Sequence, residues 1–352
     1  MTSQSLFRTG ATALAFSLAM ALGAQAAELV KFNGVTAQGG PTAQMFPVFI
    51  AMEKGFYKEE GLDVTLNYSK GSSDAARQLA AGNADWGIFS SAATMQTVQR
   101  GFPLKAIMQI YYPDTFDIVV PESSPVKTMA DMKGKIIGVS DLAGGEVPMV
   151  RASIVEAGLK EGPDVRLVIA GEGDPTTVRS LNEGRVQAYA GAKRDLLLLP
   201  AQGIPTRSIT PAAIAQFPGD ALLVRKETYE KDPELLTKFV RATLKGWAWG
   251  MANSDATFAL LKTKYAAASL GDNPVAAPFW ELVKTYYTAP ASVTKHGTLL
   301  PANWKIYMEY LQLGSGEQKA LAGPVDLSTL LTDDVVLRAW DGLDIEAAKK
   351  TP

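Results

Sequence analysis

The chain of 352 residues has no cysteine, one histidine and a formal net charge of −2 at pH 7. The lack of cysteine excludes disulfides, thiolate metal ligands and a cysteine nucleophile, and one histidine leaves little for a metal site, so we expect neither metal nor cofactor. The balanced charge leaves no basic patch for a polyanion, so no nucleic-acid partner is expected. The length suggests about two domains.

The first residues have the pattern of a secretory signal peptide. Arg8 precedes an apolar run from Ala11 to Leu22, and Ala24-Gln25-Ala26 is a small-residue cleavage site. The apolar run is too short for a membrane-spanning helix. We expect residues 1–26 to be removed near Ala26 and the mature protein to be periplasmic. The alternative is a buried N-terminal helix.

Strands and helices alternate along the rest of the chain. Short alternating or apolar stretches predict strands, and helical patterns that end at glycine predict helices. The expected strands are 29–35, 62–68, 85–89, 104–112, 135–140, 165–170, 187–190 and 204–209, and the expected helices are 44–54, 74–81, 147–157, 175–182, 235–251, 255–265, 277–288 and 301–313. This order predicts an α/β fold with largely parallel strands and right-handed crossovers.

One pattern occurs twice. Arg77-x-Leu79-x-x-Gly82-x-x-Asp85 recurs as Arg179-x-Leu181-x-x-Gly184-x-x-Gln187, each time between an expected helix and an expected strand. We interpret the two stretches as matching units of two similar lobes that close on a small solute.

Two extended segments are candidates for the connection between the lobes. Phe116–Pro121 leads outward and Phe217–Val224 leads back, and we expect both to act as hinge strands. This assigns residues 27–116 and 225–352 to the first lobe and 117–224 to the second. The alternative is two unrelated domains in series.

The stretch Phe46–Val64, FPVFIAMEKGFYKEEGLDV, resembles the solute-binding proteins of bacterial nitrate, sulfonate and taurine ABC importers. That family includes binders of thiamine-pyrimidine precursors. Gly71-Ser72-Ser73, Ser90-Ser91 and the stretch MADMKGKIIGV at 129–139 are similar to the same family. The resemblance implies a two-lobed periplasmic-binding fold of type II, with two mixed sheets joined by hinge strands. It also implies a small solute in the cleft and a membrane permease as partner, and we expect a monomer.

Ligands of open α/β sheets bind beyond the carboxyl ends of strands, near helix N-termini. Four turns fit this description, and their candidate ligand-binding residues are Gly40, Thr42, Ser72, Ser73, Ser90 and Ser91 in the first lobe and Ser140, Gly144, Gly145 and Glu146 in the second. A serine before a helix can also be an ordinary N-cap. We rank Ser90 first and Ser72 second.

Three further residues are candidates for the cleft. Tyr111 and Tyr112 end a strand, and adjacent strand residues face opposite ways, so one of the two can face the cleft. The candidate chosen is Tyr112, which could cover a planar or alkyl ligand, or pack in the core. Asp174 could face the ligand or simply cap a helix, since a proline follows it. Lys193 could neutralise nearby acids or bind an anionic ligand. If Glu146 or Asp174 faces the ligand, an amine, amidine or heterocycle is favoured over a bare sulfonate.

The leading interpretation is a non-catalytic binding protein that captures a small organic solute for an ABC importer. The solute could be a sulfonate, a nitrate-like anion, or a pyrimidine or other aromatic compound. The fold also resembles that of a thiamine-pyrimidine synthase, which uses a histidine, a lysine and a cysteine-rich motif. Because the chain has no cysteine and His296 is far from the cleft turns in sequence, we expect no catalytic residue and no enzyme. A binding protein that signals to a membrane receptor is the third possibility.

Overall fold

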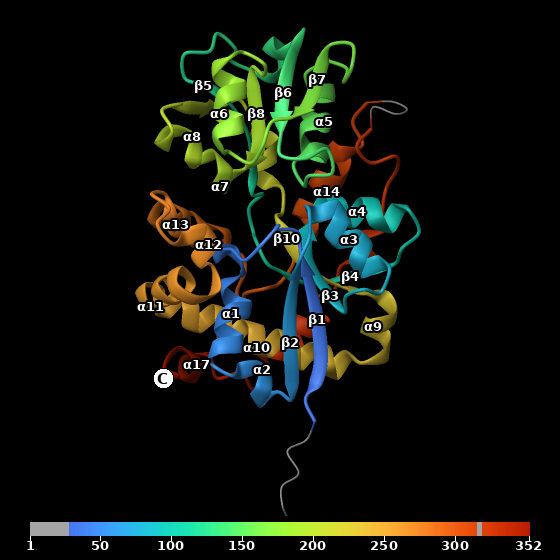
Figure 1. Ribbon diagram of the computed structural model, residues 1–352. Coiled ribbons are helices and arrows are strands. Elements are labelled where there is room, and N and C mark those ends of the chain that lie inside the picture. The colour runs from blue at the N-terminus through green and yellow to red at the C-terminus, as the bar shows by residue number, and fades with distance from the viewer. Residues whose placement is uncertain (1–27, 315–318) are drawn as a thin grey trace, which may run out of the picture.

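The computed structural model describes residues 28–314 and 319–352, so the expected signal peptide lies outside the described residues. Figure 1 shows two halves stacked along the long axis, each built on one sheet, and we call them the first and second lobes. The green elements form most of the second lobe, whereas blue, orange and red elements form the first. The predicted two-lobed α/β fold with two mixed sheets is confirmed.

The sheet of the first lobe has the strand order β2-β1-β3-β10-β4. Strands β1, β2 and β3 are parallel, and β10 is antiparallel to both of its neighbours. The bounds are β1 Val30–Thr36, β2 Leu62–Tyr68, β3 Trp86–Ser90, β4 Leu104–Gln109 and β10 Asp220–Arg225.

The second sheet repeats this arrangement, with the order β7-β6-β8-β5-β9. Strands β6, β7 and β8 are parallel, and β5 is antiparallel to β8 and β9. The bounds are β5 Phe116–Pro121, β6 Lys135–Val139, β7 Val165–Ile169, β8 Ala188–Ala192 and β9 Thr206–Ser208. Each lobe therefore has the same topology, which places the carboxyl ends of its parallel strands at the edge facing the other lobe.

The two predicted hinge strands are full members of the sheets. Phe116–Pro121 is β5 of the second sheet, and most of Phe217–Val224 belongs to β10 of the first sheet. The chain instead crosses between the sheets in residues 110–115 and 209–219. These crossing segments are hydrogen-bonded to each other, because Gly219 N donates to Tyr111 O over 3.1 Å. They lie so close that a Cβ at Gly219 would be 2.5 Å from Pro113 O.

The helices cover the faces of both sheets. In the first lobe and its C-terminal extension they are α1 Phe46–Glu53, α2 Phe56–Glu59, α3 Ser72–Ala80, α4 Ser91–Gln99, α9 Lys226–Lys231, α10 Pro233–Ala252, α11 Ser254–Leu260, α12 Ala267–Leu270, α13 Ala276–Tyr286, α14 Pro301–Leu311, α15 Leu327–Leu330, α16 Asp334–Trp340 and α17 Ile345–Lys349. In the second lobe they are α5 Val147–Glu156, α6 Pro175–Asn182, α7 Lys193–Leu196 and α8 Leu198–Ala201. Within the described ranges, every helix is too short or too polar to cross a bilayer.

Helix α14 connects the two lobes on the side of the crossings. It packs against α4 of the first lobe and α5 of the second. Tyr310 of α14 donates its hydroxyl to Glu156 Oε2 over 2.6 Å, and its neighbour Tyr307 stacks on Phe217 with ring centroids 4.2 Å apart. As a result, one buried apolar cluster runs from the first sheet into the second.

Candidate functional site

A cavity of about 740 Å³ lies between the lobes. Its walls are the turns that follow β1, β2, β6, β7 and β8, together with residues of α12 and α13. The site therefore forms where the topology predicts it, at the carboxyl ends of the parallel strands. Of the sequence-predicted residues, those that line this cleft are Gly40, Thr42, Ser72, Ser140, Gly144, Gly145 and Glu146.

Ser72 lies where the two lobes meet. Helix α3 begins at Ser72 after Gly71, whose φ of 86° is left-handed, so Ser72 is the first helical residue and not the cap that the sequence suggested. The Ser72 hydroxyl accepts a hydrogen bond from Ser90 N over 3.3 Å. A Cβ added at Gly145 of the second lobe would come within 2.8 Å of Ser72 Oγ. The turns after β2 and β6 are therefore in contact.

Serines 73, 90 and 91 do not line the cleft. Ser90 is the N-cap of α4, and its hydroxyl accepts from Ala93 N over 3.3 Å. The Ser91 hydroxyl donates to Gly219 O over 2.5 Å and so ties α4 to the returning crossing. Ser73 lines a separate groove of about 640 Å³ between α3, the end of α4 and the turn after β6. The residue ranked first from the sequence, Ser90, thus has a structural role.

Tyr112, Asp174 and Lys193 also lie outside the cleft lining. The Tyr112 hydroxyl is buried and accepts from Gly297 N over 2.7 Å. Asp174 is the N-cap of α6, accepting from Thr176 N and Thr177 N over 3.0 and 3.1 Å. Lys193 donates its ammonium to the backbone oxygen of Asp114 over 2.8 Å. Each of these three side chains therefore forms a hydrogen bond within the protein. For Tyr112 and Asp174, core packing and helix capping were the structural alternatives to ligand binding.

Glu146 lines the cleft but is already satisfied. It is 2% exposed, and its Oε1 accepts from Ser140 N over 3.0 Å and from the Ser140 hydroxyl over 2.5 Å. Burial raises the pKa of its carboxyl. Glu146 therefore fixes the turn after β6 and has little left to offer a ligand.

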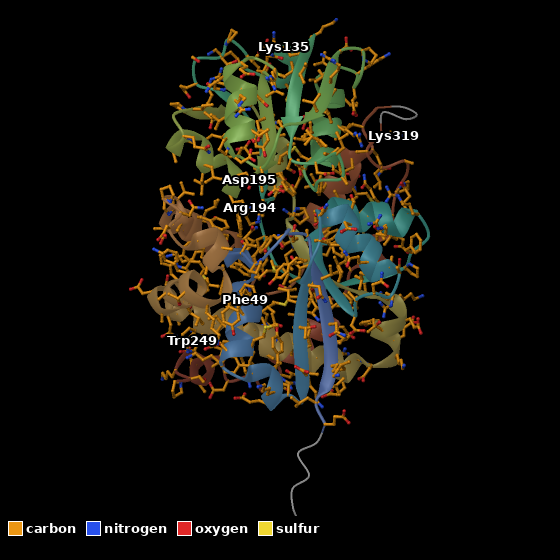
Figure 2. The ribbon with its side chains drawn as sticks, viewed as in Figure 1. Phe49, Lys135, Arg194, Asp195, Trp249 and Lys319 are labelled. Atoms are coloured by element: carbon orange, nitrogen blue, oxygen red, sulfur yellow. The ribbon has the colours of Figure 1, made fainter. Side chains whose placement is uncertain are left out.

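The cleft is rich in acids. It contains five carboxylates and two cations, namely Asp141, Glu146, Glu172, Asp195, Asp220, Lys70 and Arg194. Arg194 is already engaged, because its Nε is 3.0 Å from Asp195 Oδ1 and a terminal nitrogen is 3.9 Å from Glu172 Oε2. Figure 2 shows Arg194 and Asp195 where the second lobe faces the first. The net charge of the lining disfavours a bare anion.

Asp220 was not singled out from the sequence. It is the first residue of β10, it is 4% exposed, and it lines the cleft. Its backbone oxygen accepts from Ile110 N and Tyr111 N, both over 3.0 Å. Its carboxylate has no hydrogen-bond donor and no ion pair among residues 28–314 and 319–352. Burial and then the charge of Asp114 raise the pKa of Asp220 to about 7.

The Asp220 carboxyl lines the cleft, where an N–H donor of a solute can reach it and form a charge-assisted hydrogen bond. Asp220 is therefore the residue of the cleft best prepared to accept an N–H group. Two aromatic side chains line the same cavity, Phe116 from β5 and Phe279 from α13. One ring comes from each lobe, so both could cover a planar ligand. No signal in the sequence marks Asp220, because its role depends on where the returning crossing enters the first sheet.

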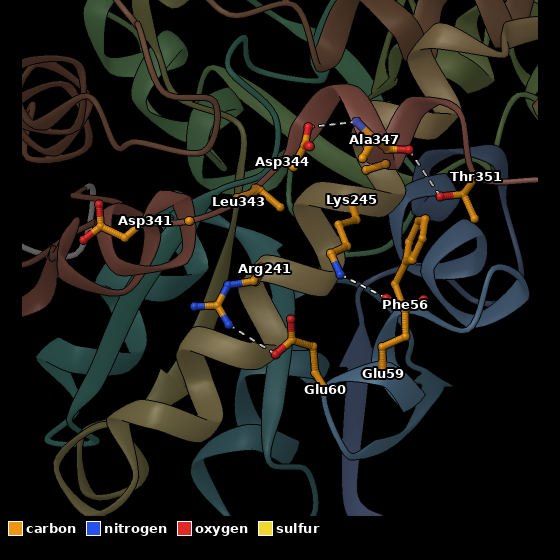
Figure 3. Close-up of a pocket in the computed structure, with 12 residues that line it drawn as sticks. Phe56, Glu59, Glu60, Arg241, Lys245, Asp341, Leu343, Asp344, Ala347 and Thr351 are labelled. Atoms are coloured by element: carbon orange, nitrogen blue, oxygen red, sulfur yellow. Dashed lines mark hydrogen bonds and ion pairs between the residues drawn. The ribbon is translucent and has the colours of Figure 1, made fainter.

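A second cavity, of about 440 Å³, lies between α2, α10 and α17 (Figure 3). Both of its cations are paired with acids, because Arg241 is 3.2 Å from Glu60 Oε2 and Lys245 is 3.0 Å from Glu59 Oε2. The other two acids of its lining, Asp341 and Asp344, are exposed. The pairing leaves no side chain in it comparable to Asp220. In the part of the chain that the structure describes, no three His, Cys, Asp or Glu side chains gather in a way that could hold a metal ion.

A family model described as NMT1/THI5 like matches residues 42–257, which is more than half of the chain. The chain belongs to the NMT1/THI5-like family. The expected resemblance is thereby confirmed at the level of the family.

Relatives of this NMT1/THI5-like chain include both binding proteins and enzymes. The riboflavin-binding protein RibY of Chloroflexus aurantiacus is 26% identical over 84% of this chain and 83% of its own length. The 4-amino-5-hydroxymethyl-2-methylpyrimidine phosphate synthase THI11 of Saccharomyces cerevisiae is 30% identical, but over only 28% of this chain and 29% of its own. Sequence identity to these relatives therefore does not separate a binding protein from an enzyme.

The fold is similar to that of solved periplasmic binding proteins. The aliphatic sulphonate-binding protein SsuA of Escherichia coli superposes with a TM-score of 0.62 at 17% identity, covering 86% of this chain and 91% of that one. At this identity the likeness establishes the two-lobed fold and nothing about the ligand.

Proposed function

We propose that this protein is the periplasmic solute-binding component of an ABC importer. It captures a small organic solute in the cleft between its lobes and delivers it to a membrane permease. The lobes divide at the crossings 110–115 and 209–219, which serve as the hinge. Membership of the NMT1/THI5-like family and the similarity to RibY along most of both chains support this function.

The solute is a planar heterocycle or other aromatic compound that carries N–H donors or a positive charge. The single observation that carries this assignment is Asp220, a buried carboxylate of the cleft without a donor among the described residues. Phe116 and Phe279 supply apolar surface for a ring. A sulfonate or nitrate is disfavoured, because the one arginine of the lining is held by Asp195.

A catalytic function is less well supported. His296, the single histidine, is 5% exposed and stacks on Trp247 with ring centroids 3.7 Å apart, away from the cleft lining. Burial lowers its pKa to about 3, so it stays neutral at pH 7. General acid–base work by this imidazole in the cleft would require it to lie within reach of the solute.

Thermal-shift and calorimetric screening of the purified protein tests the proposal. The panel contains riboflavin, 4-amino-5-hydroxymethyl-2-methylpyrimidine, benzamidine, an alkanesulfonate and nitrate. We expect N–H donors or aromatic cations to raise the melting temperature, and Asp220→Asn to weaken their binding by about ten- to a hundredfold, as for loss of a charged hydrogen bond.

Asp174→Asn is the matched control, because it neutralises an acid that caps α6 outside the cleft. It should leave affinity unchanged. Binding of sulfonate or nitrate alone, unaffected by Asp220→Asn, would refute the assigned solute class. Turnover of a panel member in place of stable binding would refute the binding-protein function itself.

A further inference from the structure

The turn after β1 carries two glutamines that line the cleft. Gln38 and Gln44 flank residues 39–42, and they are 8% and 3% exposed. Their side chains are therefore enclosed by the site and do not lie on the outer surface. Buried amide groups of a protein are nearly always hydrogen-bonded, so an amide that the chain itself leaves unbonded points to a partner from outside the chain.

Neighbouring polar groups of the same wall are bonded within the protein. The Thr42 hydroxyl accepts from Gln44 N over 3.2 Å. The Ser69 hydroxyl donates to Thr36 O over 2.9 Å. Gln38 is half used, because its Oε1 accepts from the Thr36 hydroxyl, whereas its Nε2 has no acceptor among the described residues. This turn therefore keeps an N–H donor at Gln38 for a solute.

The Gln44 carboxamide forms no hydrogen bond in the part of the chain that the structure describes. The backbone of the same residue is engaged, because its nitrogen donates to the Thr42 hydroxyl and its oxygen accepts from the hydroxyls of Tyr287 and Tyr111 over 2.6 and 3.2 Å. These hydrogen bonds hold the Gln44 backbone in place and leave its side chain to the cavity that it lines. A fixed backbone lowers the cost of ordering a side chain on a ligand.

Tyr111 connects Gln44 to Asp220. Its backbone nitrogen donates to Asp220 O over 3.0 Å, and its hydroxyl donates to Gln44 O. Gln44 and Asp220 consequently belong to the wall that the first lobe contributes to the cleft. The two side chains offer different groups, because a carboxylate only accepts, whereas a carboxamide accepts and donates from neighbouring atoms.

We propose that Gln44 is a specificity-determining residue of the cleft, which binds a solute edge that has an acceptor atom beside an N–H donor. The inference rests on the proposed function and narrows its solute class. A lactam, an imide or an aminopyrimidine has such an edge, and a glutamine carboxamide meets it with two parallel hydrogen bonds, as it does on adenine. Gln38 Nε2 is a second donor for a further carbonyl or ring nitrogen. The site thereby selects heterocycles of this kind over amidines, which only donate.

Gln44→Glu tests the donor half of this contact, because it keeps the length and an acceptor but removes the N–H group. Calorimetry compares 4-amino-5-hydroxymethyl-2-methylpyrimidine, which has a ring nitrogen beside its amino group, with benzamidine, which has no acceptor at neutral pH. We expect the variant to bind the pyrimidine about tenfold more weakly or worse, and benzamidine at least as tightly as the wild type does. A purely structural role of Gln44 would lower both affinities together.

Gln44→Met separates the lost donor from the added charge, since it has a similar length and an uncharged thioether. It should also weaken pyrimidine binding by about tenfold. Gln202→Met is the matched control, because it removes an amide that donates to Gly173 O over 2.7 Å outside the cleft lining, and it should leave both affinities unchanged. Wild-type pyrimidine affinity in both Gln44 variants overturns the inference, as does a parallel loss of both ligands in Gln44→Glu.

Nitrogen-15 NMR of glutamine-labelled protein observes the contact itself. Gln44→Met assigns the side-chain amide signal of Gln44 in the wild-type spectrum. Saturating pyrimidine should shift this signal and slow the exchange of its protons with water, whereas the Gln202 signal should stay in place. An unmoved Gln44 signal in a protein that binds the pyrimidine overturns the inference and leaves the proposed function standing, as does a wild type that binds benzamidine but neither the pyrimidine nor riboflavin. A wild type that binds no member of the panel refutes the proposed function and the inference together.

Discussion

Asp85 and Gln187 make the same backbone contact in the two sheets. Asp85 Oδ2 accepts from Asn33 N of β1 over 2.8 Å, and Gln187 Oε1 accepts from Ile136 N of β6 over 3.0 Å. Both residues end the repeated pattern that starts at Arg77 and Arg179, and each leads directly into a parallel strand, β3 or β8. The repeat therefore fixes the turn between a helix and the parallel strand that follows it. Its residues do not line the cleft.

Removing either side chain should cost stability without affecting the cleft. Asp85→Ala and Gln187→Ala should each lower the free energy of unfolding by about 0.5–1.5 kcal/mol, since each leaves one backbone N–H without its partner. Urea unfolding measures the loss. Asp63→Ala, at an exposed position of β2, is the control and should stay within about 0.5 kcal/mol of the wild type. Wild-type stability in both test variants would contradict the structural reading of the repeat.

Closure of the cleft depends on the absence of a side chain at Gly145. A Cβ there would lie 2.6 Å from Phe116 Cζ and 2.8 Å from Ser72 Oγ. Gly145→Ala should therefore separate the lobes at this contact and weaken solute binding by about tenfold or more. Small-angle scattering should report a larger radius of gyration.

Gly39→Ala is the matched control, because it changes a glycine of the same cleft that has no atom within 4 Å of the added Cβ. It should bind as the wild type does. Equal affinities for all three proteins would show that the Ser72–Gly145 contact is irrelevant to capture.

Ser90 and Asp174 should matter for stability and not for affinity. Each is an N-cap, of α4 and α6 respectively, and lies outside the cleft lining. Ser90→Ala and Asp174→Ala should each lower the free energy of unfolding by about 0.5–2 kcal/mol. Calorimetric titration with the solute found by screening should give wild-type dissociation constants. A tenfold loss of affinity in either variant would contradict the prediction and show that the substituted residue contributes to solute binding.

His296 should make the protein sensitive to acid. Burial lowers its pKa to about 3, against about 6.5 in the unfolded chain. Between these values the unfolded state binds a proton that the folded state does not, so the free energy of unfolding falls as the pH drops through this window. The slope is at most about 1.4 kcal/mol per pH unit.

The acids of the cleft and crossing act in the opposite direction. Burial raises the pKa values of Asp114, Asp195 and Asp220 to about 7, 6 and 7, so their contribution to stability is lost as the pH rises through these values. His296→Phe keeps a ring against Trp247 and leaves these acids in place. The difference between wild type and His296→Phe, measured by urea unfolding from pH 7 to pH 4, isolates the histidine. A difference that does not change with pH would contradict the prediction.

Much of the fold could be predicted because the local signals agree. Helix α6 has the predicted bounds Pro175–Asn182, since Asp174 and Pro175 mark its start as the sequence suggested. The cleft turns followed from the rule that ligands meet the carboxyl ends of strands, and Ser72 and Gly145 do lie there. These features depend on residues that are neighbours in the chain.

Features that depend on distant segments were not predictable in the same way. The sequence pattern of a serine before a helix is the same whether the serine hydroxyl caps the helix or faces a cavity. In the structure the Ser90 hydroxyl caps α4. Asp220 acquires its place only when the returning crossing pairs with Tyr111, far away in sequence. Long-range packing therefore decides which polar side chains remain free for a solute.

The position of β10 has a consequence for synthesis on the ribosome. This strand lies between β3 and β4, and among the described residues it is the strand of the first sheet that pairs with β4. The whole second sheet, from β5 to β9, is made before β10 emerges. A nascent chain that stops short of β10 holds three parallel strands and an unpaired β4 with apolar residues exposed, while the second lobe can already fold from contiguous sequence. The lobe whose first strand is made first is therefore the lobe whose sheet is completed last.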